Sequence, residues 1–469
     1  MDTSFGILSL LPPLVVIGLA IWKKQLFPAI LLGILTGEII IARVNVINAV
    51  ITSLDDSLRI FGDKVNLQII LFSLLAGGLL RLIRESNGFI GFIEWFEKKK
   101  FFRQKKTVYP LTYLLNISLF IDSWSSILIT GSMVRSIYTK FKISRERLAY
   151  FLHTIAINFV ALAILNSWGA YYMSLLRAQN VENPLRIILN SLPFNFYCIG
   201  SLVLIVVVML TDLTIGPMRK AERMIDAVVH LESEPIEDTD FQLRSQREGP
   251  IPSAMNLFLP LVVLIALVFL GLYISGEGSI VRGSGSASLF NGACITIVLM
   301  SIFYFIRGIF RFEEILEIVF KGMADLLPIG VLIALAMTIG DVCKQVGTGI
   351  YLADLVKHGI PLFLLPALVF ALSCVISFAT GTSYGTFAIM VPIVMPMSSA
   401  MGINPALMFG ACIGGGVFGD NCSPISDTSI LTGMISEIKV IEHVRTQIPY
   451  ALITASASIL LYLVFGLFQ

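Results

Sequence analysis

Long apolar runs, separated by short polar segments, make up most of the chain. Many of these runs approach or exceed the roughly 20 residues that a helix needs to cross the hydrocarbon core of a bilayer. The stretch 45–64 is amphipathic and too polar to span, so we expect it to lie flat at the membrane interface, and 307–321 has the same character. The pattern predicts an all-α polytopic membrane protein. The apolar runs are 5–22, 25–43, 66–84, 108–139, 148–176, 187–211, 254–274, 287–306, 324–342, 360–377, 378–401, 405–436 and 447–468.

Composition indicates the same class of protein. Of the 469 residues, 56% are hydrophobic and 14% are charged, whereas soluble domains carry about 25% charged residues. The six cysteines are scattered through apolar runs without CxxC spacing, which indicates neither a disulfide framework nor a zinc site. The net charge of +2 carries no information on nucleic acid. We expect the chain to lie in the lipid bilayer, with no nucleic-acid partner and no cofactor.

Basic residues set the orientation of the chain, because Lys and Arg in short loops stay in the cytoplasm. The basic clusters in 98–106, 140–147 and 216–250 are therefore expected on the cytoplasmic side, with both termini outside. The interrupted run 108–139 has such clusters at both ends, so it should enter from the cytoplasm and return there. By the same rule, 360–401 should enter and leave from outside. The sequence thus predicts two opposed re-entrant hairpins.

The two halves of the chain match each other at a fixed spacing. A shift of 258 residues places Phe120 on Phe378 and carries 66–84 onto 324–342. An odd number of crossings between the halves inverts the second half against the first, an arrangement found in many secondary transporters. The predicted organisation is a first inverted repeat, a cytoplasmic linker and a second inverted repeat, at 1–215, 216–252 and 253–469.

Polar residues collect where these helices should break. The segment Gly381-Thr382-Ser383 lies at the expected tip of the second hairpin, where glycine permits a non-helical turn. Hydroxyls and freed carbonyls at such a turn are oxygen ligands for a small cation, and a helix N-terminus offers donors to an anion. The alternative interpretation is that these small residues only allow close helix packing. The matching polar interruption at 122–126 in the first hairpin favours a functional role.

Three acidic residues lie at the same apparent depth, where a charge is costly unless it is paired or used. Asp420 and Asp427 flank Pro424, which breaks the helix and frees backbone carbonyls as further ligands. Asp122 is the only acid of the first hairpin. For Asp427 and Asp122, an alternative role is to cap the helical segment that follows.

His153 lies in the membrane-embedded run 148–176, and an unperturbed histidine changes its charge near neutral pH. It is either a proton-coupling residue or a hydrogen-bonded packing residue. Asn158, Asn166 and Ser167 on the same run are further candidates for the site.

These segments define a candidate site at the middle of the membrane. Its candidate Na+ ligands are Asp420, Asp427, Thr382 and Ser383. The candidates for ion or substrate binding in full are Asp122, Ser123, Ser125, Asn158, Asn166, Thr380, Gly381, Thr382, Ser383, Asp420, Asn421, Ser423, Ser426, Asp427 and Thr428, and His153 is the candidate for proton coupling.

This chain lacks the motifs that other classes of protein need. No Gly-rich run ends in Gly-Lys-Ser/Thr, so no nucleotide-driven pump is encoded, and no His/Cys/Glu set has metalloprotease spacing. We therefore expect a transporter and not an enzyme. A transporter-derived sensor or partner subunit without flux is a further class, which the dense intramembrane polarity disfavours.

Two long motifs in the second half resemble a known family. The segments GTSYGTFAIMVPIV and GGGVFGDNCSPISDTSIL are similar to those of the NhaC-type sodium/proton antiporters, within the ion transporter superfamily. KISRERLAY, NSWGAYY and TQIPYAL also look like that family, so the likeness covers nearly the whole chain. The resemblance implies a scaffold domain, a mobile transport domain, a homodimer and ion-coupled transport across the cell membrane. Relatives exchange sodium for protons, or carry organic solutes such as malate, lactate or amino acids.

Three positions depart from the pattern of that family. The acid of the first hairpin is often doubled, but Asp122 is followed by Ser123 and Trp124. His153 stands where the family usually has a further acid, and Asn421 stands where a histidine usually follows Gly-Asp. Fewer acids in the first half leave fewer proton carriers. The primary hypothesis is Na+/H+ antiport, and the alternative is Na+- or H+-coupled transport of a small organic solute, an amino acid or a carboxylate.

Overall fold

The computed structural model describes residues 5–23, 25–43, 45–92, 105–120, 122–228, 250–278, 283–348, 351, 354 and 361–469. Every element within these ranges is helical, and no strand occurs among them. Seven of the helices are long and apolar enough to cross a membrane, or nine spans result if two bent helix pairs each count as one. The expected class, an all-α multi-pass membrane protein, is confirmed. Most of the basic cluster 98–106 and of the linker 216–252 lies outside the described residues.

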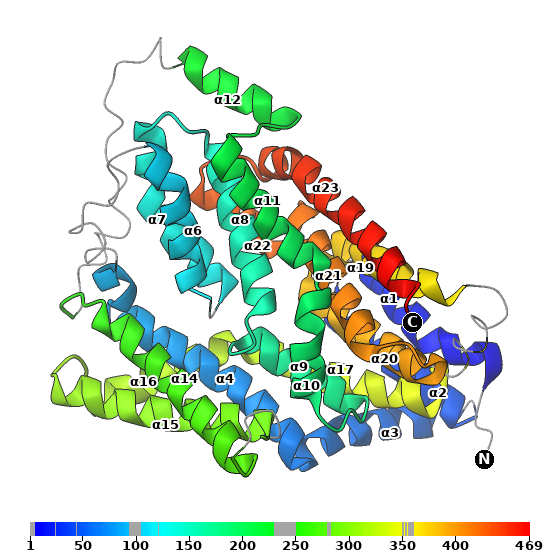
Figure 1. Ribbon diagram of the computed structural model, residues 1–469. Coiled ribbons are helices and arrows are strands. Elements are labelled where there is room, and N and C mark those ends of the chain that lie inside the picture. Colours follow the sequence, from blue (N-terminus) through cyan, green and yellow to red (C-terminus); the bar gives the residue numbers. More distant parts are fainter. Residues whose placement is uncertain are drawn as a thin grey trace.

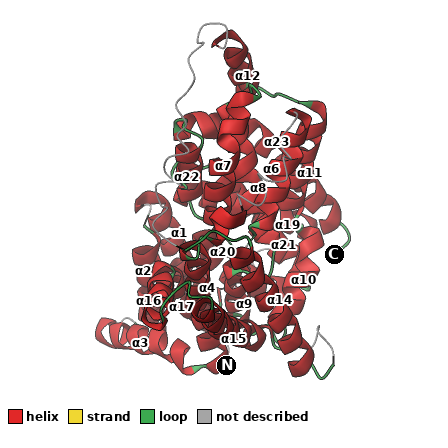
Figure 2. Cartoon of the chain, turned by 90° about the vertical axis from the view of Figure 1, so that its left-hand side faces the viewer, coloured by secondary structure: helices red, strands yellow, loops and turns green. Residues whose placement is uncertain are grey.

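A first helix group joins two sets of helices that are far apart in the sequence (Figures 1 and 2). Its members are α1 (Leu11–Lys23), α2 (Leu26–Ile41), α3 (Val46–Arg59), α4 (Lys64–Glu85), α14 (Met255–Ser275), α15 (Gly285–Ile306), α16 (Phe312–Asp325) and α17 (Leu327–Gln345). α4 packs against α15 and α16, and α17 packs against α2. α4 and α16 cross so closely that a Cβ atom on Gly77 would overlap the backbone carbonyl of Gly322. Small residues at a crossing allow such close packing of helices in a membrane.

Two helices of this group, α3 and α16, are amphipathic. Asn45 caps α3 by accepting a hydrogen bond from the backbone N–H of Asn48 at 3.2 Å, and the helix exposes apolar side chains such as Ile47 and Leu54. α16 likewise exposes Phe320. Apolar side chains on one face and polar ones on the other are typical of helices that lie in the membrane interface. The two amphipathic stretches of the sequence are therefore helical.

A second helix group contains two helical hairpins and a broken helix (Figures 1 and 2). Its members are α6 (Lys105–Ser118), α7 (Ser123–Lys140), α8 (Arg145–Leu162), α11 (Phe196–Thr211), α19 (Leu365–Thr380), α20 (Ser383–Met401), α21 (Pro405–Cys422), α22 (Asp427–Ile435) and α23 (Val440–Gly466). α19 packs along α21, and α7 packs against both α8 and α22. α9 (Ser167–Ala178) follows α8 and contacts helices of both groups, namely α4, α17 and α20.

The polar interruptions in the sequence are turns or breaks in the structure. α6 ends in a turn at 119–120 and α7 begins after Asp122, whereas the two residues 381–382 join α19 to α20. α8 and α9 meet at an angle of 46°. α21 and α22 are separated by 423–426, where Pro424 lacks the backbone N–H that would continue the helix. The hairpin tips and the break after α21 bring their polar groups to one cavity.

One apolar run is divided in a way that its pattern does not predict. The sequence reads 187–211 as a single run, but α10 (Pro184–Ser191) and the 3-10 turn η3 (Leu192–Phe194) are bent by 45° from α11. Asn195 caps the start of α11 with its side chain. Pro193 removes one backbone donor just before this cap, which favours the end of the preceding helix at this point.

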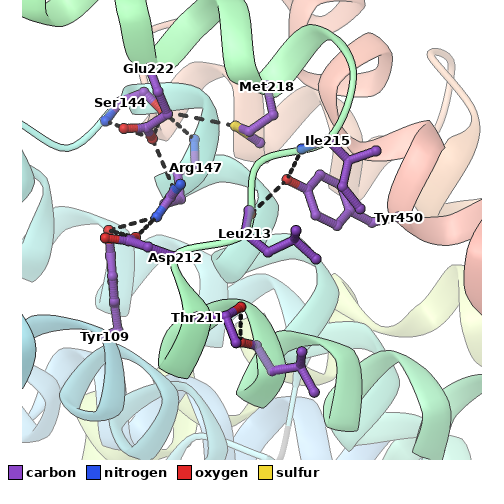
Figure 3. A network of polar contacts seen from close by, with 11 residues as sticks. Tyr109, Ser144, Arg147, Thr211, Asp212, Leu213, Ile215, Met218, Glu222 and Tyr450 are labelled. Carbon is purple, nitrogen blue, oxygen red and sulfur yellow. Dashed lines mark hydrogen bonds and ion pairs between the residues drawn. The ribbon is translucent and has the colours of Figure 1, made fainter.

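The start of the linker is held against the second helix group by a cluster of charged residues (Figure 3). Arg147, buried near the beginning of α8, pairs with Asp212 and with Glu222, whose carboxylate lies 2.9 Å from the guanidinium. Ser144 donates its hydroxyl proton to Glu222 at 2.6 Å. Because Glu222 belongs to α12 (Pro217–Val228), these contacts fix the first helix of the linker to the end of α8. A buried guanidinium requires such partners, since an unpaired buried charge is strongly unfavourable.

Candidate functional site

The tips of both hairpins and the break between α21 and α22 line one cavity of about 1070 Å³ between the two helix groups. The wall formed by the first group includes Arg81 and Arg84 on α4 and Asp325 on α16. The structure therefore brings most of the acids and hydroxyls expected from the sequence to one place. The sequence candidates that line the cavity are Asp122, Ser123, Ser167, Gly381, Thr382, Ser383, Asp420, Asp427 and Thr428.

Asp420 lies at the centre of this arrangement, with its side chain almost fully buried. Ser383, at the start of α20, donates its hydroxyl proton to Oδ2 at 2.6 Å. Ser426 and Thr428 both donate to Oδ1, the second at 3.0 Å. Hydrogen bonds to an ionised carboxylate are among the stronger ones in proteins, so three hydroxyl donors offset part of the cost of burial. Asp420 thus ties the tip of the second hairpin to the break that follows α21.

Glycines let α21 carry Asp420 deep into the second group. A Cβ atom on Gly415 would overlap the backbone carbonyl of Phe370, and one on Gly419 would overlap the backbone of Phe378, both on α19. Backbone contact of this kind is possible only where the side chain is a hydrogen atom. The glycine-rich segment before Asp420 is therefore explained by close packing of α21 on α19.

The tip of the second hairpin is a left-handed turn. Gly381 has φ +70°, and a Cβ atom there would lie 2.8 Å from the side chain of Ile425 and 3.0 Å from its carbonyl oxygen. Thr382 then caps α20, its hydroxyl accepting a hydrogen bond from the backbone N–H of Gly385 at 3.4 Å. The tip therefore packs directly against the break between α21 and α22. Thr380 donates its hydroxyl proton to a carbonyl of its own helix and does not line the cavity.

The first hairpin presents Asp122 to the cavity and uses it as a helix cap. Its Oδ2 accepts hydrogen bonds from the backbone N–H and from the hydroxyl of Ser125, each at 2.9 Å, so it begins α7 as the N-cap. Asp122 is therefore the cap of α7, and because it also lines the cavity a part in ion binding stays a prediction. Asp122 differs in this from Asp420, whose partners come from other elements.

A contact between Trp124 and Asp427 joins the first hairpin to the break in the second half. The indole Nε1 donates a hydrogen bond to Oδ2 of Asp427 at 3.0 Å. Ser426 occupies the N-cap position of α22, and Asp427, as its first residue, accepts from the backbone N–H of Thr428 at 2.9 Å. Asp427 thus contributes to the start of α22 without being its N-cap. Asp427 also lines the cavity, next to the indole N–H from which it accepts a hydrogen bond.

Besides Ser125 and Ser426, which bind Asp122 and Asp420, four of the expected site residues are buried and do not line the cavity. Asn166 caps α9 and donates to the carbonyl of Phe120 at 3.2 Å, so it holds the tip of the first hairpin in place. The other three bind nearby groups: Asn158 donates to the carbonyl of Thr154, Asn421 donates to the hydroxyl of Tyr197, and Ser423 accepts from the N–H of Ile425. Their contacts position the helices around the cavity, and a direct part in binding stays a prediction.

Several cavity residues were not among the candidates from the sequence. The hydroxyl of Tyr384 lies 3.3 Å from that of Ser167, and its ring packs against Trp168. Arg81 pairs with Asp325 at 2.9 Å across the first helix group. Tyr384 directly follows the tip residue Ser383, so its position beside the polar tip could have marked it as a site residue. The arginines read as ordinary charges at the end of an apolar run, and nothing local shows that they line a cavity.

His153 is buried beside the cavity and connects it to α23. Its Nε2 lies 3.0 Å from the hydroxyl of Thr428, and its Nδ1 lies 2.9 Å from Nε2 of His443 and 3.2 Å from Nε2 of Gln447. His443 and Gln447 were not found from the sequence, because they are 290 and 294 residues away from His153 along the chain. No spacing rule links such distant positions.

Within the described part of the chain, no group of three or more His, Cys, Asp and Glu side chains could hold a metal ion. A cation at this site would thus depend on a mixture of carboxylate, hydroxyl and carbonyl oxygens. The carboxylates of Asp420 and Asp427 and the hydroxyls of Thr382 and Ser383 all line the cavity and are of that kind. Hard cations prefer such oxygen ligands.

The fold is that of a helical membrane transporter. Its helices superpose on the YdaH transporter of Alcanivorax borkumensis with a TM-score of 0.54 at 14% identity, covering 86% of this chain and 85% of that one. Residues 166–467, more than half of the chain, match the model of the Na+/H+ antiporter family. The chain belongs to the Na+/H+ antiporter family, and its resemblance to the NhaC type is confirmed.

Three relatives illustrate the range of this similarity. An uncharacterized protein of Haemophilus influenzae is 28% identical over 99% of this chain and 92% of its own length. The Na(+)/H(+) antiporter NhaC of Alkalihalophilus pseudofirmus is 28% identical over 32% of this chain and 31% of its own. The arginine/ornithine antiporter ArcD of Halobacterium salinarum is 35% identical over 22% of each chain. Relatives of this chain thus include carriers of ions and carriers of amino acids.

Proposed function

We propose that the protein is a secondary active transporter that exchanges Na+ for H+ across the cell membrane. The observation that carries the proposal is Asp420, a buried carboxylate within an apolar run that accepts hydrogen bonds from three hydroxyls and still lines a cavity. Intramembrane acids are costly and are kept where they bind ions or protons. A carboxylate binds one proton or one cation, so binding of either displaces the other. That competition is the chemical basis of exchange.

The Na+ site that we propose is shared between the second hairpin and the following break. Asp420 and Asp427 supply the negative charge, and the hydroxyls of Thr382 and Ser383 supply further oxygens. Asp122 adds a third carboxylate on the wall formed by the first hairpin. The support is that all five line the same cavity.

We further propose that the chain consists of two inverted repeats, at 1–215 and 253–469, with opposed re-entrant hairpins. The order of elements supports this proposal, because a pair of apolar helices, an amphipathic helix, a long helix, a hairpin and a bent or broken helix follow one another in each half. The basic residues at 140–147, beside the open end of the first hairpin, favour entry from the cytoplasm. Both termini would then lie outside. By analogy with the family, the first helix group would form the scaffold and the second the transport domain. A homodimer stays a prediction from the family.

The ion site is tested by Asp420→Asn, which removes a charge at nearly constant size. A ligand that binds only the folded protein raises its stability, so Na+ should raise the thermal unfolding temperature of the unaltered protein. We expect the variant to fold and to lose this Na+-dependent increase. Asp55→Asn, an exposed change on α3, is the control and should keep the increase. Unchanged Na+ stabilisation in Asp420→Asn would remove this residue from the site.

A second candidate function is Na+- or H+-coupled transport of a small organic solute, an amino acid or a carboxylate. The cavity, at about 1070 Å³, is of the size that holds small molecules and far larger than one cation requires. Arg81 and Arg84 lie on one wall and Asp122 and Asp427 on the other, which suits a solute that carries both charges. ArcD, an amino-acid antiporter, supports this alternative. Flux in proteoliposomes under imposed Na+ and pH gradients, with and without an amino-acid or carboxylate pool, separates the two functions.

A further inference from the structure

Two buried histidine rings contact each other within the second helix group. His153 on α8 and His443 on α23 are both fully buried, with Nδ1 of the first 2.9 Å from Nε2 of the second and ring centres 5.0 Å apart. Neither ring lines the cavity. Gln447, one turn further along α23, also reaches Nδ1 of His153 and donates to the backbone carbonyl of Asn421 at 2.8 Å. The ring of His153 is therefore held in a fixed position.

The hydrogen bonds continue from His153 to the acid at the centre of the site. Nε2 of His153 lies 3.0 Å from Oγ1 of Thr428, and this hydroxyl donates to Oδ1 of Asp420 at 3.0 Å. Three successive hydrogen bonds thus join His443 to Asp420. Each intermediate group can both accept and donate a proton, because imidazole has two ring nitrogens and a hydroxyl has a proton and lone pairs.

The other end of this series lies near the end of the molecule that carries the basic residues. His443 is in the first turn of α23, next to the exposed Glu442. Just before α23, Glu437 pairs with Arg135 and Arg145 at 2.9 and 2.8 Å, at the end of α7 and the start of α8. Basic residues of this kind mark the cytoplasmic side. Nδ1 of His443 is buried and has no hydrogen-bond partner among the described residues, so its lone pair or proton is not held by another group.

We propose that His443 and His153 form a proton path from the cytoplasmic side to Asp420, separate from the cavity that gives Na+ access to the same carboxylate. The inference rests on the proposed Na+/H+ exchange and deepens it. Apart from the charged first turn of α8, the helices that form the path have the charged side chains Asp420, Asp427, Glu442 and Arg445. In the described part of the chain, side-chain hydrogen bonds through the hydroxyl of Thr428 connect the carboxylate of Asp420 to the rings.

Proton transfer along the path is balanced at every step. A proton from cytoplasmic water binds Nδ1 of His443, and the proton on its Nε2 moves to Nδ1 of His153. The proton on Nε2 of His153 passes to the hydroxyl of Thr428, whose own proton passes to Asp420. Each step breaks one N–H or O–H bond and forms another, so one proton enters and one arrives. When Asp420 returns its proton to the cytoplasm along the same path, the reverse sequence restores the starting tautomers. When Asp420 releases it into the cavity instead, each ring must exchange its Nδ1 proton for one on Nε2 before the next proton enters.

The test is His443→Gln. Glutamine keeps a polar side chain, but unlike imidazole it cannot bind a proton at one atom and release another proton from a second atom. In proteoliposomes, we expect Na+-driven proton movement to be at least about tenfold slower than in the unaltered protein. Exchange of labelled Na+ for unlabelled Na+, which moves no proton, should continue. His153→Gln should give the same pattern. Arg445→Gln, an exposed change in the same turn of α23, is the matched control and should keep both activities.

The possible outcomes separate the path from the function on which it rests. Normal proton movement in His443→Gln and His153→Gln would overturn the path alone. Loss of both proton movement and Na+ exchange would show that the histidines only support the fold, and would also overturn it. Absence of Na+/H+ exchange in the unaltered protein would overturn the proposed function and the path together.

Discussion

Within the described residues, hydroxyl groups and not basic side chains are the side-chain partners of the Asp420 carboxylate. Ser383, Ser426 and Thr428 each donate a hydroxyl proton to this carboxylate. A hydroxyl can rotate and present its lone pairs instead, so the same oxygens can help to coordinate a cation. An arginine or lysine in their place would neutralise the acid permanently. The residue-level chemistry therefore suits a position that alternates between a proton and Na+.

The sequence identifies the acids and hydroxyls of the site for a physical reason. Polar side chains at membrane depth are costly, so Asp420 and Asp427 stand out in an apolar run without any knowledge of the fold. The same argument cannot find Trp124 or His443, because aromatic and imidazole side chains are common packing residues. Their roles arise from partners in the other half of the chain, at 303 residues for Trp124 and 290 for His443.

Trp124→Phe tests the contact between the two halves at the level of one hydrogen bond. The change keeps an aromatic ring but removes the donor to Asp427, and a hydrogen bond to a charged group contributes roughly 1.5–3 kcal/mol when well formed. Because Trp124 is 45% exposed, we expect the smaller effect of about a two- to tenfold weaker Na+ response. The Na+ concentration that gives half of the thermal stabilisation measures this. Trp22→Phe, at an exposed position outside the site, should leave it unchanged, and an unchanged value for Trp124→Phe would separate this contact from ion binding.

At the scale of elements, the helices and their interruptions follow from the positions of apolar runs, glycine and proline. The start of α7 at Asp122, the turn at 381–382 and the break at 423–426 all occur where the sequence places polar residues within such runs. The bend at Asn195 was not predicted, because one asparagine in an apolar run does not distinguish a cap from a packing residue. Tertiary contacts decide between those roles, and they are not visible in the local pattern.

Gly381→Ala tests whether the second hairpin tip must touch the break between α21 and α22. Alanine pays about 1–2 kcal/mol for the left-handed conformation and would also clash with Ile425. Gly402→Ala is the matched control, since Gly402 has nearly the same φ, +69°, and open space around its Cβ position. We expect a larger loss of thermal stability for Gly381→Ala, together with a weaker Na+ response that the control does not show. Equal losses without a change in the Na+ response would mean that the contact with Ile425 does not shape the site.

At the scale of the whole molecule, the sequence predicts the class of fold and the side of the membrane on which each loop lies. This membrane topology can be tested directly. We expect cysteines at Lys98 and Lys220 to react with an impermeant reagent from the cytoplasm, and one at Ser284 to react from outside. Five of the six native cysteines are buried, and Cys294→Ala removes the one that is partly exposed. Labelling of position 98 from outside would overturn the hairpin orientation and the inverted repeat.

The partners of Asp420 all belong to the second helix group, whereas Arg81, Arg84 and Asp325 on the facing wall belong to the first. The hydrogen bonds of Asp420 therefore do not tie the two helix groups together, as the proposed movement of one group past the other requires. The consequence is pharmacological. A small molecule that binds Arg84 through an anionic group and Asp427 through a cationic group would link the two helix groups across the cavity. If the proposed function holds, such a molecule should block transport without contacting His153 or His443, because neither histidine lines this cavity.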